Sequence, residues 1–273
     1  TSKNNNLESK KMTMNLIKSI KKFTKINYSL WVIDNNSSIE LIEDFLQNDD
    51  INFISIRKKL YWEKYKLNFI RFSKYKLENG SYNNAFMLDV ASRLVSQNTK
   101  YFLSLHDDII VCNHNWLEYL ISKLDNENKV ISSMQDKLRI NAMHVSTLLF
   151  DFRLFNKLDV NIYPKLKNIY SSALIHDVAD DITSKFNTNG YGYFSCKNTY
   201  NNHELNDLIS DNNIFKNINV DKILDDNNNL ILVHLGRGYM KSLNKYNRVN
   251  KISLHEWNIL ADQTLNENIN YRS

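Results

Sequence analysis

Proline and glycine are scarce in this chain, whose 273 residues include one proline and five glycines. Other residues must therefore build most turns, and the abundant asparagines adopt turn conformations readily. The sequence also lacks a membrane-spanning apolar run and a secretory signal pattern. We therefore expect a protein of the cytoplasm.

The number of cysteines and the net charge are also low. Cys112 and Cys196 are too few and too isolated for a disulfide framework, so a reducing compartment is the default. The formal net charge of +5 suits an anionic ligand or a negatively charged membrane surface without requiring either. A peripheral association with the inner face of the membrane is compatible with this charge.

Helical and extended patterns alternate in the N-terminal part of the chain. Residues 12–23 and 39–46 are predicted helices, and residues 28–33 and 51–56 are predicted strands. This alternation is typical of crossover units and indicates an α/β fold with a mostly parallel sheet. Further helices are predicted over 82–95, 113–124 and 254–260, strands over 101–111, 130–134 and 230–233, and a strand running into a short helix over 143–155.

Three of the predicted strands end in hydrophilic residues. Asp34 follows the first, His106, Asp107 and Asp108 interrupt the second, and His234 follows the third. Open α/β sheets bind ligands at the carboxyl ends of their strands. Crowded carboxylates and imidazoles are costly there unless a cation or a hydrogen-bonding ligand compensates them. We therefore expect a divalent metal near His106 and Asp108.

Basic and aromatic residues alternate over residues 57–76. Such a segment can bind nucleic acid through phosphate contacts and base stacking. The net charge is low for a dedicated nucleic-acid binder, so an exposed helical excursion is the favoured interpretation. We expect no nucleic-acid partner.

Taken together, the motifs resemble the family 2 glycosyltransferases, which have the GT-A fold. The sequence VIDNNSS at 32–38 resembles the family's strand that ends in Asp-Asn-x-Ser, and residues 101–109 resemble the strand that ends in the Asp-x-Asp motif. Asn84, Trp116-Leu117, His176-Asp177-Val178 and the segment from Val233 to Gly236 are similar to further family positions.

This resemblance implies a Rossmann-like, mostly parallel central sheet flanked by helices in a single domain. The catalytic domain would span residues 1–240, with a helical tail over 241–273. The family's first strand would precede residue 1. The enzyme would transfer a sugar, with inversion, from a nucleoside diphosphate sugar to a hydroxyl of a glycan, lipid-linked or protein acceptor, as in polysaccharide or glycoconjugate synthesis.

Site roles follow from the same resemblance. Asp108, His106 and His234 would hold Mn²⁺ or Mg²⁺, and Asp177 would be the general base, with Asp180 and Asp181 as rivals. All three acidic residues would also suit a helix N-terminus without any chemistry. The donor would be bound by Asp34, Asn36, Ser37, Asn84, Asp107, Arg237 and Tyr239.

One departure from the family pattern concerns the metal motif, because His106 occupies the position of its first aspartate. Imidazole and carboxylate suit Mn²⁺, whereas Mg²⁺ prefers an oxygen-rich shell. This departure keeps open a GT-A-fold binding protein that no longer catalyses. A nucleotidyltransferase is a further alternative, although it would need an early glycine-rich phosphate loop that the sequence does not show.

Overall fold

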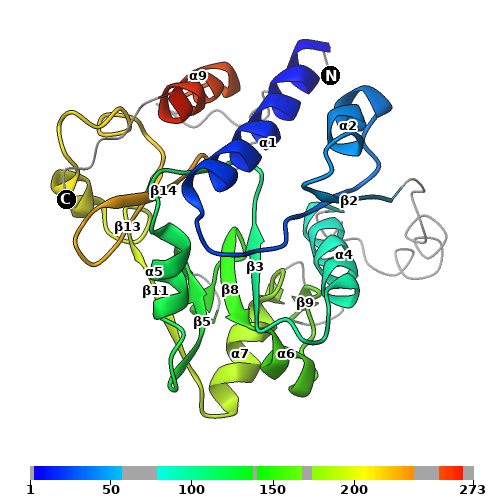
Figure 1. Cartoon of the computed structure of the whole chain (residues 1–273). Helices are drawn as coiled ribbons and strands as arrows, with labels where there is room; N and C mark the ends of the chain where they lie inside the picture. The colour runs from blue at the N-terminus through cyan, green and yellow to red at the C-terminus, as the bar shows by residue number, and fades with distance from the viewer. Residues whose placement is uncertain (1–2, 57–78, 138–139, 168–173, 237–251, 267–273) are drawn as a thin grey trace. The chain divides into compact units, whose positions relative to one another are not determined.

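Residues 3–56, 79–137, 140–167, 174–236 and 252–266 are described by the computed structural model (Figure 1). The chain divides into two units, each assembled from separated segments. The first unit combines Thr1–Ile26, Leu105–Ser122 and Cys196–Ser273, and the second combines Asn27–Ser104 and Lys123–Ser195. The basic and aromatic segment 57–76 lies outside the described residues.

A four-stranded antiparallel sheet forms the centre of the first unit. Its strand order is β12 (Lys197–Asn198), β13 (Asp221–Leu224), β14 (Leu230–His234) and β4 (Ile109–Val111). The strands β4 and β14 are almost wholly apolar and buried, which explains why they lie in the middle of the unit's core. The short 3₁₀ helix η1 (His203–Leu208) precedes β13 in the chain.

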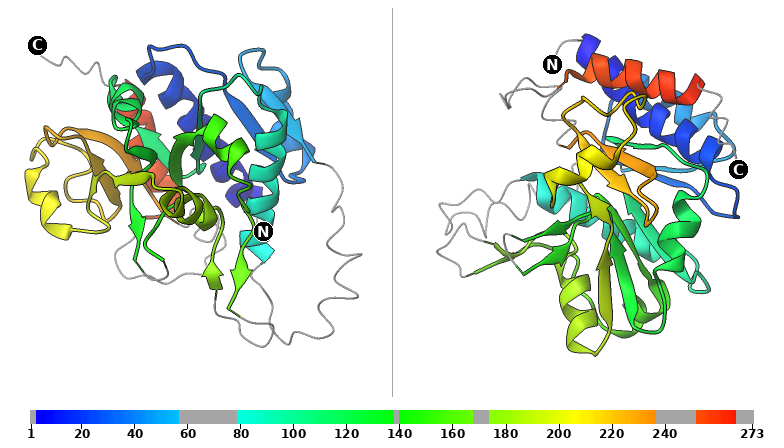
Figure 2. Two further views of the ribbon diagram at one scale, coloured as in Figure 1. Left: turned by 90° about the horizontal axis from the view of Figure 1, so that it is seen from below. Right: turned by 90° about the vertical axis from the view of Figure 1, so that its left-hand side faces the viewer.

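Two helices from distant parts of the sequence cover this sheet. Helix α1 (Lys3–Phe23) packs along α9 (Leu254–Asn266) and against β4, as Figures 1 and 2 show. The apolar stripe predicted for α1 is confirmed, since Met12, Leu16, Ile20 and Phe23 are all buried. Helix α5 (Trp116–Ser122) is anchored to the loop after α1 by a hydrogen bond from the Trp116 indole to the Thr24 hydroxyl, 2.9 Å long.

Polar contacts fix the register between α1 and α9. The buried Asn15 amide donates to the Asn258 amide oxygen at 3.3 Å, and Asn258 donates to the Glu8 carboxylate at 2.6 Å. Near the end of α9, the Lys22 ammonium donates to the carbonyls of Thr264 and Leu265. A cation at this point satisfies carbonyls that have no partner within the helix and complements the helix dipole.

The second unit contains a mixed sheet with the strand order β11 (Gly192–Ser195), β5 (Asn128–Ser132), β8 (Thr147–Asp151) and β3 (Tyr101–Leu105). Strand β11 is parallel to β5, but β8 is antiparallel to it. The α/β class is therefore confirmed, whereas the expected mostly parallel arrangement is not found among the described strand pairs. The described residues between β5 and β8 form a short antiparallel pair, β6 (Gln135–Asp136) and β7 (Ala142–Met143), and no crossover helix, so the chain returns antiparallel.

A smaller parallel pair in the second unit agrees with the predicted strand–helix–strand order. Strand β1 (Trp31–Asp34) leads through α2 (Ile39–Leu46) to β2 (Asn52–Ser55), and the strands pair in parallel from Trp31↔Asn52 to Asp34↔Ser55. The remaining elements are α4 (Asn79–Leu94), α6 (Phe152–Lys157), β9 (Lys165–Leu166), β10 (Leu174–His176) and α7 (Asp180–Thr188).

Helices pack on the mixed sheet through one aromatic-rich core. The predicted stripe of α4 is confirmed, because Ala85, Leu88 and Ala91 are buried and Val95 packs against the same cluster. Phe102 stacks on Phe150 with ring centroids 5.3 Å apart. The core also includes Phe152, Phe155, Val178, Ile182 and Phe186 from α6, α7 and the loop before α7.

Asparagine makes several tight turns, as the scarcity of glycine predicts. Asn36, Asn141 and Asn228 have backbone φ angles of 61°, 55° and 66°, a left-handed region that asparagine tolerates better than most residues. Gly190, with φ of 84°, follows α7 and begins the turn into β11. No helix in the described part of the chain is both long and apolar enough to cross a membrane.

Candidate metal centre

The first unit brings three of the predicted metal ligands together. Asp108 directly precedes β4, and His234 is the last residue of β14. The two strands are antiparallel neighbours in which His234 pairs with Ile109, and the Leu235 amide donates to the Asp108 carbonyl at 2.9 Å. His106 lies in the turn that leads into β4. Strand pairing therefore places these side chains side by side.

The three side chains form a compact cluster. One ligand atom from each of His106, Asp108 and His234 lies within 4.8 Å of the others. Nε2 of His234 is 3.3 Å from an oxygen of Asp108. Asp108 and His234 are only 3% and 5% exposed, and His106 is half-buried. The donor atoms are thus close enough together that these three side chains could hold a metal ion.

Asp221 contacts the other side of the His234 ring. It is the first residue of β13 and pairs with His234 across the sheet. Nδ1 of His234 donates to the Asp221 carboxylate at 3.2 Å. The sequence patterns did not single out Asp221, because nothing local to it marks β13 as the neighbour of β14. The contact depends on the antiparallel register, which a lone acidic residue does not reveal.

The charges of these groups favour a cation. Burial alone would lower the pKa of His234, but Asp108 and Asp221 outweigh burial and raise that pKa to about 9. Burial is also the main reason why the pKa of His106 is lowered. Without metal at pH 7, one imidazolium therefore lies between two carboxylates while His106 is neutral. The cluster and Asp221 together then have one net negative charge.

Asp107 lies in the same turn as His106 and Asp108, but it is exposed to solvent. Loss of hydration in the crowded turn and the nearby Asp108 carboxylate raise the pKa of Asp107. The contact with water that the exposed side chain keeps limits this rise. Asp107 is thus adjacent to the cluster in sequence and accessible from solvent, which is compatible with its predicted contact to a ligand.

Asp34, Asn36 and Ser37 lie in the second unit, in the turn between β1 and α2. Both oxygens of Asp34 accept a hydrogen bond from the Ser37 amide at 3.2 Å, and the Ser55 hydroxyl donates to Asp34 at 2.6 Å. Asn36 has the left-handed backbone of the turn. Ser38 occupies the N-cap position of α2 but makes no side-chain capping bond, so Asp34 organises this turn. Whether these residues bind a donor stays a prediction.

The acidic entrance to α7 is also in the second unit. The Asp180 carboxylate accepts a hydrogen bond from the Asp177 amide at 2.7 Å, and Asp181 accepts one from the Asn161 amide at 2.9 Å. Asp180 and Asp181 are buried and hold the backbone, while Asp177 is half-buried. Among the three candidate bases, Asp177 is the one more accessible to a substrate.

The described part of the structure does not bring the remaining predicted donor-binding residues, Asn84, Arg237 and Tyr239, together in one site. Asn84 is exposed on α4 of the second unit. Arg237 and Tyr239 lie outside the described residues. Their assignment therefore stays a prediction.

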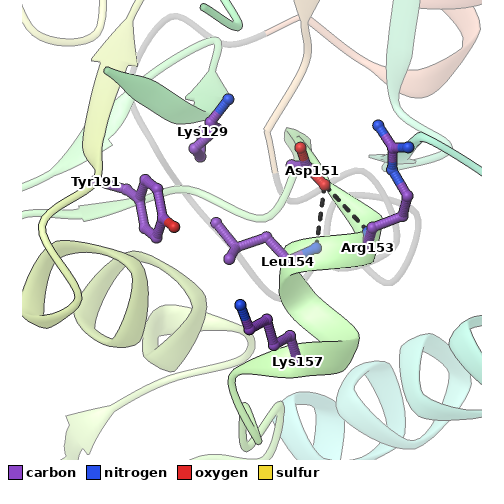
Figure 3. A pocket seen from close by; sticks show the side chains of 6 residues that line it. All are labelled: Lys129, Asp151, Arg153, Leu154, Lys157 and Tyr191. Atoms are coloured by element: carbon purple, nitrogen blue, oxygen red, sulfur yellow. Dashed lines mark hydrogen bonds between the residues drawn. The ribbon is translucent and has the colours of Figure 1, made fainter. Parts of the chain in front are cut away.

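A separate hollow of about 250 Å³ lies in the second unit. Figure 3 shows Lys129, Arg153, Lys157 and Tyr191 around it, with Asp151 hydrogen-bonded to the first amides of α6. None of the predicted site residues lines this hollow. The cations would favour an anion, but Arg153 and Lys157 are exposed and the hollow is shallow.

Comparison of the sequence with protein-family models and with curated proteins finds no match. Support for a function therefore comes from the residues of this chain alone.

Proposed function

We propose that this protein is a metal-dependent glycosyltransferase that transfers a sugar from a nucleoside diphosphate sugar to an acceptor hydroxyl. The convergence of His106, Asp108 and His234, with one ligand atom of each within 4.8 Å of the others, is the observation that carries the proposal. These are the residues that the resemblance to family 2 glycosyltransferases assigns to the metal.

The donor set favours Mn²⁺ over Mg²⁺. Two imidazoles and one carboxylate give a mixed nitrogen and oxygen shell, which suits manganese and later transition metals, whereas Mg²⁺ prefers oxygen. A bound ion would act as a Lewis acid toward the diphosphate of the donor. The chain itself would supply the orientation of the ligands, exclusion of water around Asp108 and His234, and a base.

The remaining roles follow the sequence resemblance. Asp34 would accept hydrogen bonds from the nucleoside, and Asp107 would contact the ribose or the sugar. Asp177 would accept the proton of the acceptor hydroxyl as that oxygen attacks the anomeric carbon. The acceptor would be a glycan, a lipid-linked molecule or a protein.

A thermal-unfolding screen of nucleoside diphosphates and their sugar conjugates, with Mn²⁺ or with a chelator, tests this proposal. A ligand that binds only the folded protein stabilises it by about 2.7 kcal/mol at a concentration 100 times its Kd. We expect at least one nucleotide to raise the melting temperature by several degrees with Mn²⁺ and not with chelator. Release of the nucleoside diphosphate from that donor then separates an active enzyme from a binding protein.

Three other outcomes would contradict parts of the proposal. A shift with Mn²⁺ alone and with no nucleotide would leave a metal protein that is not a glycosyltransferase. Equal nucleotide shifts with Mn²⁺ and with chelator would contradict the metal's role in donor binding. Release of pyrophosphate from nucleoside triphosphates would instead favour a nucleotidyltransferase.

Metal affinity should also depend on pH. Among the described residues, Asp108, Asp221 and His106 face His234, and the two carboxylates keep its pKa near 9 in the metal-free protein. A metal must displace the proton on Nε2, so affinity falls as pH decreases below 9. Between pH 7.5 and 6.5 we expect about a tenfold loss of Mn²⁺ affinity by calorimetry, with about one proton released. An affinity that is constant over this range would contradict coordination by His234.

A further inference from the structure

Asp221 contacts the cluster directly, through the ring of His234. A histidine ring can bind a metal through only one nitrogen while the other makes a second contact. Here Nδ1 of His234 is 3.2 Å from Asp221, and Nε2 is 3.3 Å from Asp108. The cluster includes an oxygen of Asp108 but none of Asp221. The two carboxylates therefore have different roles.

Lys222, the residue after Asp221, anchors the start of β13 through hydrogen bonds of its side chain and its backbone. The Lys222 ammonium, 4% exposed, donates to the Asn206 amide oxygen at 2.6 Å and to the Lys216 carbonyl at 3.0 Å. The backbone of Lys222 exchanges hydrogen bonds with the hydroxyl and the amide of Thr199. Successive residues of a strand point to opposite faces of the sheet. The Lys222 side chain therefore fixes the strand on one face, and the Asp221 side chain is left to contact His234 on the other.

From this geometry we infer that Asp221 is a positioning residue for the metal centre. It accepts the Nδ1–H of His234, which fixes the ring and leaves Nε2 as the atom that faces the ion. Its negative charge also makes the ring a stronger ligand. This inference rests on the proposed metal site and adds a residue through which metal affinity is set.

Mn²⁺ titration of Asp221→Asn and Asp221→Ala by calorimetry, with each affinity corrected for the proton that the metal displaces from His234, tests the inference. Asparagine keeps an oxygen that can accept from Nδ1 but loses the charge, so we expect about a tenfold weaker affinity. Alanine loses both, and we expect a loss of up to about 100-fold. Glu204→Gln, which removes an exposed charge from η1 in the same unit, serves as the control and should bind as wild type does.

Nitrogen NMR of the histidine rings with Zn²⁺ bound gives a readout that does not depend on activity. In the wild type, Nδ1 of His234 should be protonated and Nε2 metal-bound, and the alanine variant should lose this single form. Wild-type affinity in both variants would overturn the inference while leaving the metal site intact. No Mn²⁺ or Zn²⁺ binding by the wild type would instead overturn the metal site, and the role of Asp221 with it. Thermal unfolding of the metal-free variants identifies any loss that is due to misfolding.

Discussion

Asp108→Asn should weaken Mn²⁺ binding by at least about 100-fold. The change keeps the size of the side chain but replaces the one charged oxygen ligand of the cluster with a neutral amide. Residues that merely support a ligand already affect affinity 10- to 100-fold, so loss of a charged ligand should cost at least as much. Calorimetric titration with Mn²⁺, and the nucleotide-dependent thermal shift in Mn²⁺, measure the effect.

Asp108 also contributes to the metal-free protein through its contact with His234. Removing one member of a buried ion pair costs roughly 3–5 kcal/mol when the other charge is left without compensation. Because Asp221 still contacts His234 at 3.2 Å, we expect the loss of unfolding free energy to be at the lower end of that range. Glu204→Gln removes one charge from the same unit and should change neither property. Mn²⁺ affinity that is unchanged in Asp108→Asn would contradict the proposed metal centre.

Trp257→Ala should destabilise the first unit by roughly 3–5 kcal/mol. The Trp257 ring is fully buried on α9, and its centroid is 6.3 Å from that of Phe215. Removal of so large a ring leaves a cavity that surrounding side chains fill only in part. Urea unfolding, followed by tryptophan fluorescence and by circular dichroism, measures the loss and shows whether both units unfold together.

Two variants sharpen this test. Ile259→Ala lies on the same helix but is 43% exposed, so it should cost much less. Among the described residues, the Trp257 indole N–H has no hydrogen-bond partner. Trp257→Phe removes this buried donor, which offsets part of the lost packing. We expect the losses to increase from Ile259→Ala through Trp257→Phe to Trp257→Ala, and any other order would contradict this account of the α9 core.

Much of the local structure could be predicted from the sequence. The apolar stripe of α1 and the strand that ends at His234 depend on residues close together in the chain, and periodicity detects them. The mostly parallel arrangement is not found among the described strand pairs, because it depends on how the chain returns between distant strands. In the described residues between β5 and β8 a short antiparallel pair takes the place of a helix, and the sequence there gives little signal for it.

The same distinction between local and long-range signals applies to the candidate site. His106, Asp108 and His234 could be found because each borders a clear apolar run. Asp221 could not, since its role depends on which residue of β14 faces it, and register arises from long-range pairing. The acidic residues at the entrance to α7 could be predicted only in part. Their position at a helix start was predictable, but the burial of Asp180 and Asp181 was not.

The pairing of α1 with α9 has a consequence for synthesis of the protein on the ribosome. Asn15 and Asn258, which are hydrogen-bonded to each other, are 243 positions apart. Chains are made from the N-terminus at about 5–20 residues per second, so α1 leaves the ribosome long before α9 exists. For that time Met12 and its neighbours have no α9 to pack against. The first unit can therefore complete its core only after the C-terminal segment has been made.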